Sequence, residues 1–383
     1  MSMKDKTFKA GRFITESSGT DFEYKYFMPN FLPEKINFVD HNISLLLEEA
    51  TQNLGELNAY SKLVPNVDFF IKMHEAKEAT ASSKIEGTRT EIDEAVMDEE
   101  NIDPERRDDW LEVQNYIKAM RFAIGELEKY PLATNLLKAT HKVLISGARG
   151  KYKTPGEIRK TQNWIGGSTI RDAHFVPPTP QEVDGLMRDL DHYWNDKALT
   201  TPLLIKAALS HYQFETVHPF LDGNGRLGRL VIVLFLIEKR KLSKPVLYLS
   251  DYFSKNRLQY YDALDAVRMN DDIERWIKFF LVAVAETAKQ SCETLQKIID
   301  LKAKNDQKIL QLGRRAQSAS KLLDTMYGSP IVDAKKAREI VGTSPTSTNV
   351  LLSELVKLGI LEEITGFSRN RLYQYSEYLG LFK

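Results

Sequence analysis

The sequence holds a single cysteine, Cys292, among its 383 residues. One thiol forms neither an intrachain disulfide nor a cysteine-rich zinc site, so nothing in the chain requires oxidising conditions. We interpret Cys292 as a helix residue without chemistry. Glycine and proline are also scarce, with 20 and 14 residues, which excludes collagen-like repeats and argues against a long low-complexity linker.

Long apolar runs and excess charge are missing as well. The longest fully apolar run, 230–237, is far shorter than the ~20 residues that span a bilayer. The N-terminal segment has charges but lacks the apolar stretch of a signal peptide. Lysine plus arginine and aspartate plus glutamate number 53 each, which excludes a generally polybasic or polyacidic protein. We therefore expect a cytoplasmic protein without membrane contact.

The dominant pattern of the chain is helical, and we expect a mainly α fold. Residues 1 to about 35 are polar and contain prolines, so we expect them to be irregular. From Ile36 on, apolar residues recur at helical spacing, and a helix over about 67–85 is expected to end at Gly87. Further helical segments are predicted over 90–96, 109–130, 135–144 and 180–310.

Two parts of the chain depart from this pattern. Residues 147–180 are rich in Gly, Thr and Pro, and the pair Gly166-Gly167 between two β-like stretches predicts a short β-hairpin. Residues 311–383 combine three predicted helices and two β-like runs, the outline of a winged-helix domain. Residues 301–383 hold 13 Lys/Arg and 8 Asp/Glu, and this net charge of +5 is compatible with phosphate contacts. The three helices are expected over 320–327, 333–341 and 344–358.

The most informative segment is HPFLDGNGRLGR, residues 218–229, which lies between two apolar helical stretches. Gly223 and Gly225 let the backbone approach a ligand closely. The amides in the first turn of the following helix form an anion site. Arg226 and Arg229 add cationic donors suited to phosphate oxygens.

The same segment contains a metal ligand and a base. Asp222 is a hard oxygen ligand beside the anion site, as Mg²⁺ requires when it bridges a carboxylate and a phosphate. Asn224 has hydrogen-bonding groups that either hold the loop or contact a phosphate oxygen. His218 lies where a base with a near-neutral pKa takes a proton from an attacking hydroxyl.

These twelve residues resemble the signature loop of Fic-domain proteins, HxFx(D/E)GNGRxxR, at every defined position. The resemblance implies a Fic-type helical bundle and an enzyme that transfers AMP from ATP to a hydroxyl side chain of a target protein, with release of pyrophosphate. It assigns the general base to His218 and the Mg²⁺ ligand to Asp222. It further implies an anion hole of Gly223, Asn224 and Gly225, and outer-phosphate contacts from Arg226 and Arg229.

Two further segments resemble parts of the same family. The predicted hairpin over 156–178 resembles the Fic flap, which clamps the target segment by strand-like hydrogen bonds. The resemblance places target docking at Asn163, Trp164, Ile165 and Gly166. Tyr260 resembles a residue near the adenine pocket of relatives, with a core aromatic as the alternative.

The segment TASSKIEG, residues 80–87, resembles the Fic inhibitory helix, (S/T)xxxE(G/N), with Ser82 and Glu86 at the defined positions. These two residues are four apart and so share one face of a helix. In the family, the glutamate pairs with the second signature arginine, here Arg229, and puts a carboxylate where the γ-phosphate of ATP belongs. The resemblance therefore implies autoinhibition by Glu86. Whether Glu86 also supports removal of AMP, as in some relatives, stays open.

We therefore expect three domains along the chain. Residues 1–110 form a helical extension that carries the inhibitory helix at about 67–87, residues 111–300 form the Fic catalytic domain, and residues 311–383 form the winged helix. The leading hypothesis is a protein adenylyltransferase that uses ATP and Mg²⁺ and acts on a Ser, Thr or Tyr of an unknown target protein or of itself. The family also suggests a homodimer.

Two alternatives remain. The first is a DNA-binding transcriptional regulator whose Fic core senses a nucleotide, with Ser347, Thr348 and Asn349 on the recognition helix and Arg369 and Arg371 in the wing. The same winged helix can instead serve protein contact or dimerisation. The second alternative is a Fic enzyme with a different nucleotide donor, because the signature residues fit a triphosphate without selecting adenine.

Overall fold

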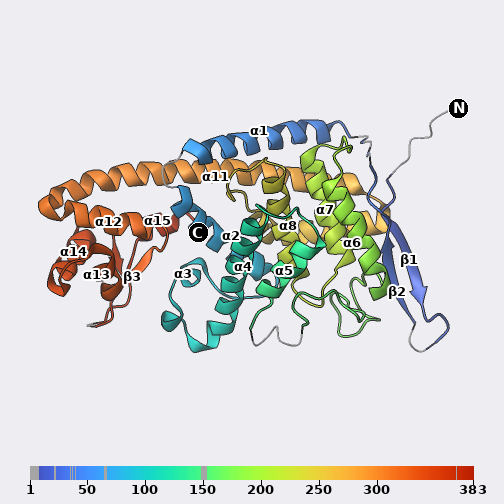
Figure 1. Ribbon diagram of the computed structural model, residues 1–383, viewed down its shortest axis with the longest axis horizontal. Helices are drawn as coiled ribbons and strands as arrows, with labels where there is room; N and C mark the ends of the chain where they lie inside the picture. Colours follow the sequence, from blue (N-terminus) through green and yellow to red (C-terminus); the bar gives the residue numbers. More distant parts are fainter. Residues whose placement is uncertain are drawn as a thin grey trace.

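The computed structural model describes residues 8–20, 23–34, 36, 38, 40–63, 67–147, 153–367 and 369–383, the side chains of 63 and 67–69 excepted. Residues 1–7, where we expect no signal peptide, lie outside the described residues. Helices dominate the structure, which confirms the mainly α prediction. The molecule is elongated, with an N-terminal hairpin at one end and the C-terminal part at the other (Figure 1). In the described ranges, no helix is long and apolar enough to cross a membrane.

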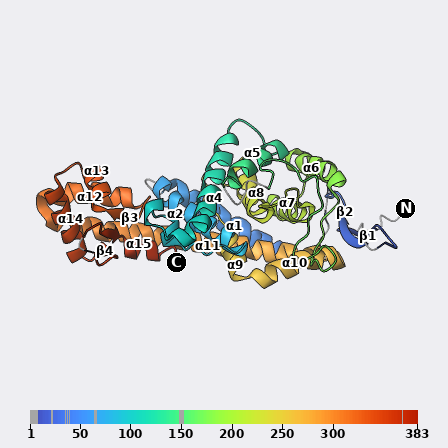
Figure 2. The same ribbon diagram turned by 90° about the horizontal axis from the view of Figure 1, so that it is seen from below.

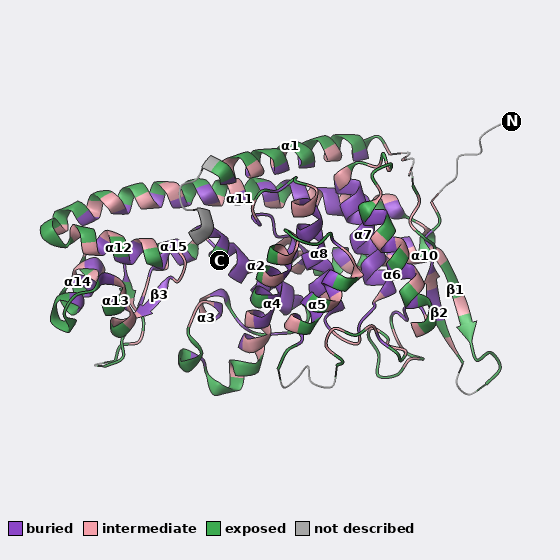
Figure 3. Cartoon of the chain, viewed as in Figure 1, coloured by how far each residue is buried: buried purple, intermediate pink, exposed green. Residues whose placement is uncertain are grey.

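Two consecutive helices, α7 (Leu203–Val217) and α8 (Asn224–Glu238), form the centre of the fold. Both are buried along nearly their whole length (Figure 3), because helices that are apolar on every side must be surrounded by others. The loop that joins them is the predicted signature loop, so both of its ends start from the buried core. The helices α4 (Arg107–Glu126), α5 (Thr134–Leu144) and α6 (Pro180–Asn195) pack on this pair. Helix α10 (Arg257–Asn270) reaches it through the hydrogen bond between Tyr260 and His211.

The longest helix, α11 (Ile273–Ile309), runs along the core and continues to the C-terminal part (Figures 1 and 2). Helix α1 (Asn42–Leu63) packs along it. Helix α2 (Val67–Ile85) confirms the prediction for 67–85 and packs on α4 and on α9 (Ser250–Lys255). Four short helical segments lie between these helices or at their ends: α3 (Ile92–Ala95), η1 (Glu99–Asn101), η2 (Pro104–Arg106) and η3 (Leu310–Arg315).

The N-terminal segment contradicts the prediction of an irregular chain. Strands β1 (Gly11–Glu16) and β2 (Tyr24–Pro29) form an antiparallel hairpin. The rings of Phe13 and Phe27 lie 5.1 Å apart across the strands, and such aromatic pairs stabilise a ladder. The Phe27 amide also donates a hydrogen bond to the carbonyl of Val176 at 2.9 Å. The prediction was wrong because this packing against a distant segment, which the sequence does not show, stabilises the hairpin.

The segment predicted as a β-hairpin over 156–178 is not a regular hairpin. Among its described residues, one isolated bridge pairs Ile165 with Phe175. Gly166 and Gly167 have φ angles of +69° and +70°, so they start a turn, but that turn is much longer than two residues. The Asp172 carboxylate stabilises the long turn by accepting hydrogen bonds from residues near its start.

The C-terminal part contains the three predicted helices, here α12 (Ala316–Met326), α13 (Ala334–Val341) and α14 (Pro345–Lys357). The two predicted β-like runs pair as β4 (Glu362–Glu363) and β5 (Leu372–Gln374). Two elements were not predicted. Strand β3 (Ile331–Asp333) joins the sheet in the order β3-β5-β4, and helix α15 (Ser376–Gly380) follows β5.

Candidate active site

The signature loop connects α7 to α8 through two residues in the left-handed region. His218, directly after α7, has a φ of 50°, and Gly223, directly before α8, has a φ of 76°. Left-handed backbone is uncommon for a non-glycine residue and gathers at functional sites. The Asn224 side chain closes the loop, because its Oδ1 accepts from the Phe220 amide and its Nδ2 donates to the Phe220 carbonyl, both at 2.8 Å. The Asn224 side chain therefore holds the loop, which is one of the two roles that the sequence left open for it.

His218 has the properties of a neutral base. Its Nδ1 lies 3.4 Å from the Glu215 carbonyl, and since a carbonyl only accepts, Nδ1 carries the proton and Nε2 keeps a free lone pair. Burial lowers the pKa of His218 to about 4, although the Glu215 carbonyl acts in the opposite direction. Arg159 fixes the backbone here, since its Nε donates to the His218 carbonyl at 2.9 Å.

Asp222 presents a carboxylate at the open side of the loop. Its side chain is 43% exposed and lies 3.6 Å from Arg226. Its carbonyl is held by His141, whose Nε2 lies 2.9 Å away. The Gly156 amide donates to the other ring nitrogen at 2.8 Å, so the proton of the neutral His141 is on Nε2. His141 thus connects the signature loop to the segment at 156, a role that no sequence pattern predicted.

The two signature arginines are both buried and both paired with carboxylates. Arg226 Nη1 lies 2.9 Å from Glu112 Oε2. Arg229 Nη2 lies 2.7 Å from Glu86 Oε1, and its side chain is only 2% exposed. Arg229 also donates from Nε to Ser82 Oγ and from Nη2 to the Ser82 carbonyl, both at 2.9 Å. The structure therefore brings Glu86 to Arg229, the pair that the family resemblance implied, and adds contacts from Ser82 to Arg229 that were not predicted.

Glu86 occupies the space in front of the first turn of α8. A Cβ on Gly225 would lie 2.3 Å from Glu86 Oε1, so a glycine at 225 is what makes room for this carboxylate. Burial raises the pKa of Glu86, but the charge and hydrogen bond of Arg229, with smaller contributions from Arg226 and His218, lower it below its ordinary value. Glu86 is therefore ionised at neutral pH and lies where the amides and arginines attract an anion.

A second carboxylate beside Arg229 was not predicted. Glu215 is 6% exposed, and its Oε1 has no hydrogen-bond partner among the described residues. Burial raises the pKa of Glu215 to about 7, and the charge of Glu86 acts in the same direction. A Cβ on Gly228 would lie 2.2 Å from Glu215 Oε1, so Gly228 provides the space for this side chain.

The predicted docking residues line the loop after Gly156. Asn163 Nδ2 donates to the Phe220 carbonyl of the signature loop at 3.0 Å, Trp164 is 42% exposed, and Ile165 makes the single bridge. Gly166 follows at the start of the turn. These residues are therefore close to the signature loop, although they do not form a regular strand.

Tyr260 lies in the core in this conformation. It is 1% exposed, its ring stacks on Phe253 at 4.7 Å, and its hydroxyl lies 2.9 Å from His211 Nε2. Because His211 Nδ1 donates to the Gly228 carbonyl at 3.0 Å, the Tyr260 hydroxyl is the donor to Nε2. The core alternative for Tyr260 is thus the one that the packing supports, and the side chain leaves no surface for a nucleotide.

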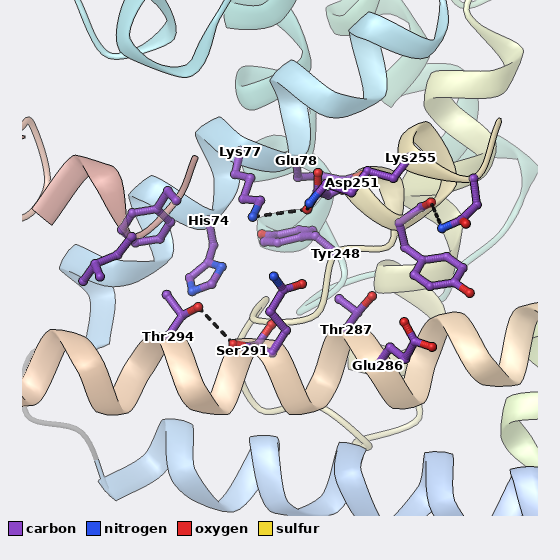
Figure 4. Close-up of a pocket in the computed structure, with 15 residues that line it drawn as sticks. His74, Lys77, Glu78, Tyr248, Asp251, Lys255, Glu286, Thr287, Ser291 and Thr294 are labelled. Atoms are coloured by element: carbon purple, nitrogen blue, oxygen red, sulfur yellow. Dashed lines mark hydrogen bonds and ion pairs between the residues drawn. The ribbon is translucent and has the colours of Figure 1, made fainter.

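A separate cavity lies between α2, α9 and α11 (Figure 4). It measures about 160 Å³ and is lined mainly by polar side chains, including the ion pair of Lys77 and Asp251 at 3.2 Å. His74 points into it and is buried, and its Nε2 has no partner among the described residues. Phe382 closes one end, with its ring 5.3 Å from that of His74. No residue of the signature loop lines this cavity.

Comparison with known proteins places these features in a family. Residues 44–125 match the N-terminal region of the Fic/DOC family, and residues 131–236 match the Fic/DOC family itself. The chain thus contains regions that match both parts of a Fic/DOC domain, in agreement with the sequence resemblance.

Relatives and solved structures agree with this classification. Protein adenylyltransferase fic-1 from Caenorhabditis elegans is 30% identical over 159 residues, which are 41% of this chain and 27% of that protein. Protein adenylyltransferase Fic from Aedes aegypti is 34% identical over 125 residues, which are 32% of this chain and 22% of that protein. The chain thus spans about a quarter of the curated relatives it matches. A Fic family protein from Desulfovibrio desulfuricans superposes with a TM-score of 0.57 at 20% identity, over 90% of this chain and 98% of that one.

Proposed function

We propose that the protein transfers AMP from ATP to a hydroxyl side chain of a target protein and releases pyrophosphate. The observation that supports this proposal best is the arrangement of the signature loop. His218 is a neutral base with a free Nε2, next to the start of α8, where backbone amides and two buried arginines attract an anion. The relatives with matching sequences are named protein adenylyltransferases.

In the proposed reaction, the target hydroxyl oxygen attacks the α-phosphorus of ATP. The bond from that phosphorus to the oxygen bridging to the β-phosphate breaks, and pyrophosphate leaves. The hydroxyl proton passes to His218 Nε2, a step that contributes about 10²–10⁴ in rate. The Gly225 amide and the guanidinium of Arg229 bind phosphate oxygens and stabilise charge that develops there. The Gly223 amide joins them once its hydrogen bond to Asp222 Oδ1 is released.

The residues present fit an Mg²⁺ ion that arrives with the nucleotide. Within the described ranges no group of three or more His, Cys, Asp or Glu side chains forms a metal site. Mg²⁺ commonly binds through one or two carboxylates plus substrate phosphates and water, and Asp222 supplies one partly exposed carboxylate. The ion, when bound there, would neutralise phosphate charge.

We also propose that Glu86 inhibits the reaction. Its carboxylate lies 2.7 Å from Arg229 and next to Gly225, so it uses the arginine that an outer phosphate requires. ATP can bind alongside Glu86 only without that contact, in a poor geometry for attack. Release of Glu86 is therefore the activating step. Whether Glu86 also supports AMP removal is a separate question for an assay that starts from modified target.

The remaining expectations complete the proposal. We keep two earlier expectations as proposals: the domain boundaries at 110, 300 and 311, and target docking at the 163–166 segment. A cytoplasmic location fits the single cysteine, and self-modification and a homodimer are part of the same proposal. The flap segment docks the target by backbone hydrogen bonds from the neighbours of Ile165, because the Ile165 amide and carbonyl both pair across the bridge to Phe175.

The decisive experiment is label transfer from ATP labelled at the α-phosphate. It compares wild type, Glu86→Gly, and Glu86→Gly combined with His218→Ala, each with Mg²⁺. We expect protein-bound label with Glu86→Gly and none with the double variant, and no label from ATP labelled at the γ-phosphate. A Glu86→Gly rate at or below wild type would refute the inhibition. Absence of label in every sample, also with GTP, CTP and UTP, would refute nucleotide transfer.

A second candidate function concerns the C-terminal part. Its element order, α12–β3–α13–α14–β4–β5 with the sheet order β3-β5-β4, supports the winged-helix interpretation and with it DNA binding. One predicted contact needs correction, because Thr348 is 1% exposed and its hydroxyl donates to the Ser344 carbonyl. Ser347 and Asn349 are exposed on α14, and Arg369 and Arg371 are exposed on the wing.

A mobility-shift assay with genomic fragments tests this second candidate. We expect a shift that weakens steeply with salt, since phosphate contacts release counterions. Asn349→Ala should reduce the shift, and Arg369→Ala should reduce its salt dependence. Absence of any salt-sensitive shift would leave protein contact as the role of this part.

A further inference from the structure

The cavity between α2, α9 and α11 (Figure 4) lies apart from the signature loop and has no part in the proposed reaction. It opens to solvent at α11, where Glu286 and Gln290 of its lining are exposed. Its volume is about 160 Å³, and an apolar cavity of about 150 Å³ holds one benzene molecule. The space therefore fits a small molecule of roughly six to ten non-hydrogen atoms.

The wall formed by α2 and α9 carries two cations that share one carboxylate. Asp251 Oδ2 lies 3.2 Å from Lys77 Nζ and 2.9 Å from Lys255 Nζ. Because both ammonium groups contact the same oxygen, one negative charge serves two positive ones. A carboxylate of a ligand would neutralise the second cation and accept charge-assisted hydrogen bonds from it.

The opposite wall carries a carboxylate that is available for a ligand. Glu286 lies on the α11 side, across from Lys77 (Figure 4). It is exposed, and no hydrogen bond or ion pair within the described ranges involves its carboxylate. Glu78, which also lines the cavity, is satisfied by a short buried chain of hydrogen bonds, since Tyr116 and Ser250 both donate to it. A ligand ammonium would therefore pair with Glu286.

His74 adds a buried polar group without a partner. Its side chain turns from α2 toward α11 (Figure 4), the residue is 7% exposed, and its Nε2 has no hydrogen-bond partner among the described residues. Burial lowers the pKa of His74 to about 4, and the charge of Lys77 acts in the same direction. The ring is therefore neutral, with one donor and one acceptor nitrogen. A polar group of a ligand would remove the cost of burying an unpaired nitrogen.

The cavity lies where the C-terminal part meets α2. Phe382 closes one end, with its ring 5.3 Å from that of His74. A second aromatic contact, of Tyr327 with Phe70 at 5.8 Å, joins the same two parts. Ligand sites occur preferentially at such junctions. A molecule in this cavity contacts α2, α9, α11 and the C-terminal part together.

We propose that this cavity binds a free amino acid with a polar side chain. The carboxylate of the amino acid contacts Lys77 and Lys255, its ammonium contacts Glu286, and its side chain hydrogen-bonds at the aromatic end. Bound there, the amino acid bridges α2 to α9 and α11 and holds α2, which carries Glu86, against the core. It thereby strengthens the inhibition by Glu86. This last step rests on the proposed function, whereas the binding site itself does not.

The first experiment screens the standard amino acids against the wild-type protein by thermal unfolding and measures the best binders by calorimetry. A ligand that binds only the folded state stabilises it, so we expect at least one amino acid to raise the melting temperature and to bind as one molecule per chain. Threonine should bind more tightly than valine, which has the same shape without the hydroxyl. Stabilisation by no amino acid would overturn the proposal, and tighter binding of valine would remove the polar contact at His74.

Two analogues of the best amino acid separate its charges. The decarboxylated amine lacks the group for Lys77 and Lys255, and the N-acetyl derivative lacks the ammonium for Glu286. Each analogue should bind at least about tenfold more weakly, the effect of one lost charge-assisted hydrogen bond. Binding of either analogue as tight as that of the amino acid would overturn the assignment to an amino acid.

Substitutions in the two walls locate the site. Glu286→Gln should raise the Kd of the amino acid about tenfold, and because Glu286 is exposed, the fold does not depend on it. The matched control is Glu293→Gln, also exposed on α11 but outside the lining, which should bind like wild type. Lys77→Met, with Lys289→Met as its control on α11, should give the same contrast. Equal Kd values for Glu286→Gln and Glu293→Gln would overturn the proposal.

Label transfer from ATP labelled at the α-phosphate tests the regulatory step, with and without a saturating concentration of the amino acid. Wild type should slow about fivefold, and Glu86→Gly should keep its rate within about twofold, because it lacks the carboxylate that α2 positions. Equal slowing of both, or a faster wild type, would overturn the regulatory step. If Glu86→Gly transfers no label, the proposed function and the regulation fail together, while the binding measurements still decide the site.

Discussion

Replacing Glu86 with glutamine separates charge from volume in the contact with Arg229. Glutamine keeps the length of the side chain and one oxygen that accepts from Arg229 Nη2, but it removes the negative charge. The contact consists of one N–O pair at 2.7 Å between an arginine side chain that is 2% exposed and a glutamate side chain that is 36% exposed. The two hydrogen bonds from Arg229 to Ser82 do not involve the altered group.

The size of the effect follows from these contacts. Both the carboxylate and the amide accept a hydrogen bond from the charged arginine, a contact of about 1.5–3 kcal/mol, and the carboxylate adds the attraction between two opposite charges. The partial exposure of Glu86 allows solvent to screen the charge, which reduces the difference. A loss of about 1 kcal/mol corresponds to a roughly fivefold larger population of free Arg229. Label transfer by Glu86→Gln should therefore rise about fivefold above wild type.

The assay is the initial rate of label transfer at an ATP concentration well below saturation. Glu86→Gly should be faster than Glu86→Gln, because glutamine still fills the space beside Gly225 that the carboxylate occupies. The expected order is wild type, then Glu86→Gln, then Glu86→Gly. A Glu86→Gln rate equal to wild type would show that charge is not the restraint, and a rate equal to Glu86→Gly would show that volume has no part in it.

Three further predictions address pH, packing and docking. Because burial lowers the pKa of His218 to about 4, the base stays unprotonated above that value, so the Glu86→Gly rate should remain level from pH 7 to 5.5 and fall only as the pH approaches 4; a half-maximal rate near pH 6.5 would contradict this. Gly228→Ala places a Cβ 2.2 Å from Glu215 Oε1 and should destabilise the protein by about 1–3 kcal/mol in urea unfolding, whereas unchanged stability would mean that Glu215 moves freely. Trp164→Ala removes a side chain that is 42% exposed, so target labelling should fall while the melting temperature and ATP affinity stay constant; equal labelling would exclude Trp164 from docking.

The sequence predicted the parts of the site that lie in short, chemically specific segments. Residues 218–229 carry a base, a carboxylate, glycines and arginines in one run, and that combination has few structural explanations. The contact between Glu86 and Arg229 joins positions far apart in the chain, and only the family resemblance connected them. The helices were predicted well because their apolar periodicity is a local property.

Other parts depend on packing that no local pattern reveals. Glu78 and Tyr116 are ordinary helix residues in the sequence, and only the meeting of α2, α4 and α9 turns them into a buried chain. Tyr260 was ambiguous because an aromatic residue on a helix suits both a core and a ligand site. The hairpin of β1 and β2 depends on Phe27 reaching a segment about 150 residues away, near Val176.

Helix α11 contains 37 residues, which corresponds to a length of about 56 Å. It joins the core to the C-terminal part, which also packs on α2, where the Phe382 ring lies 5.3 Å from that of His74. A target captured by the C-terminal part would therefore be held at a separation from His218 that the fold sets. Tethering raises the local concentration of an acceptor only when the tether spans the gap, so capture there would favour large or extended targets and exclude small compact ones.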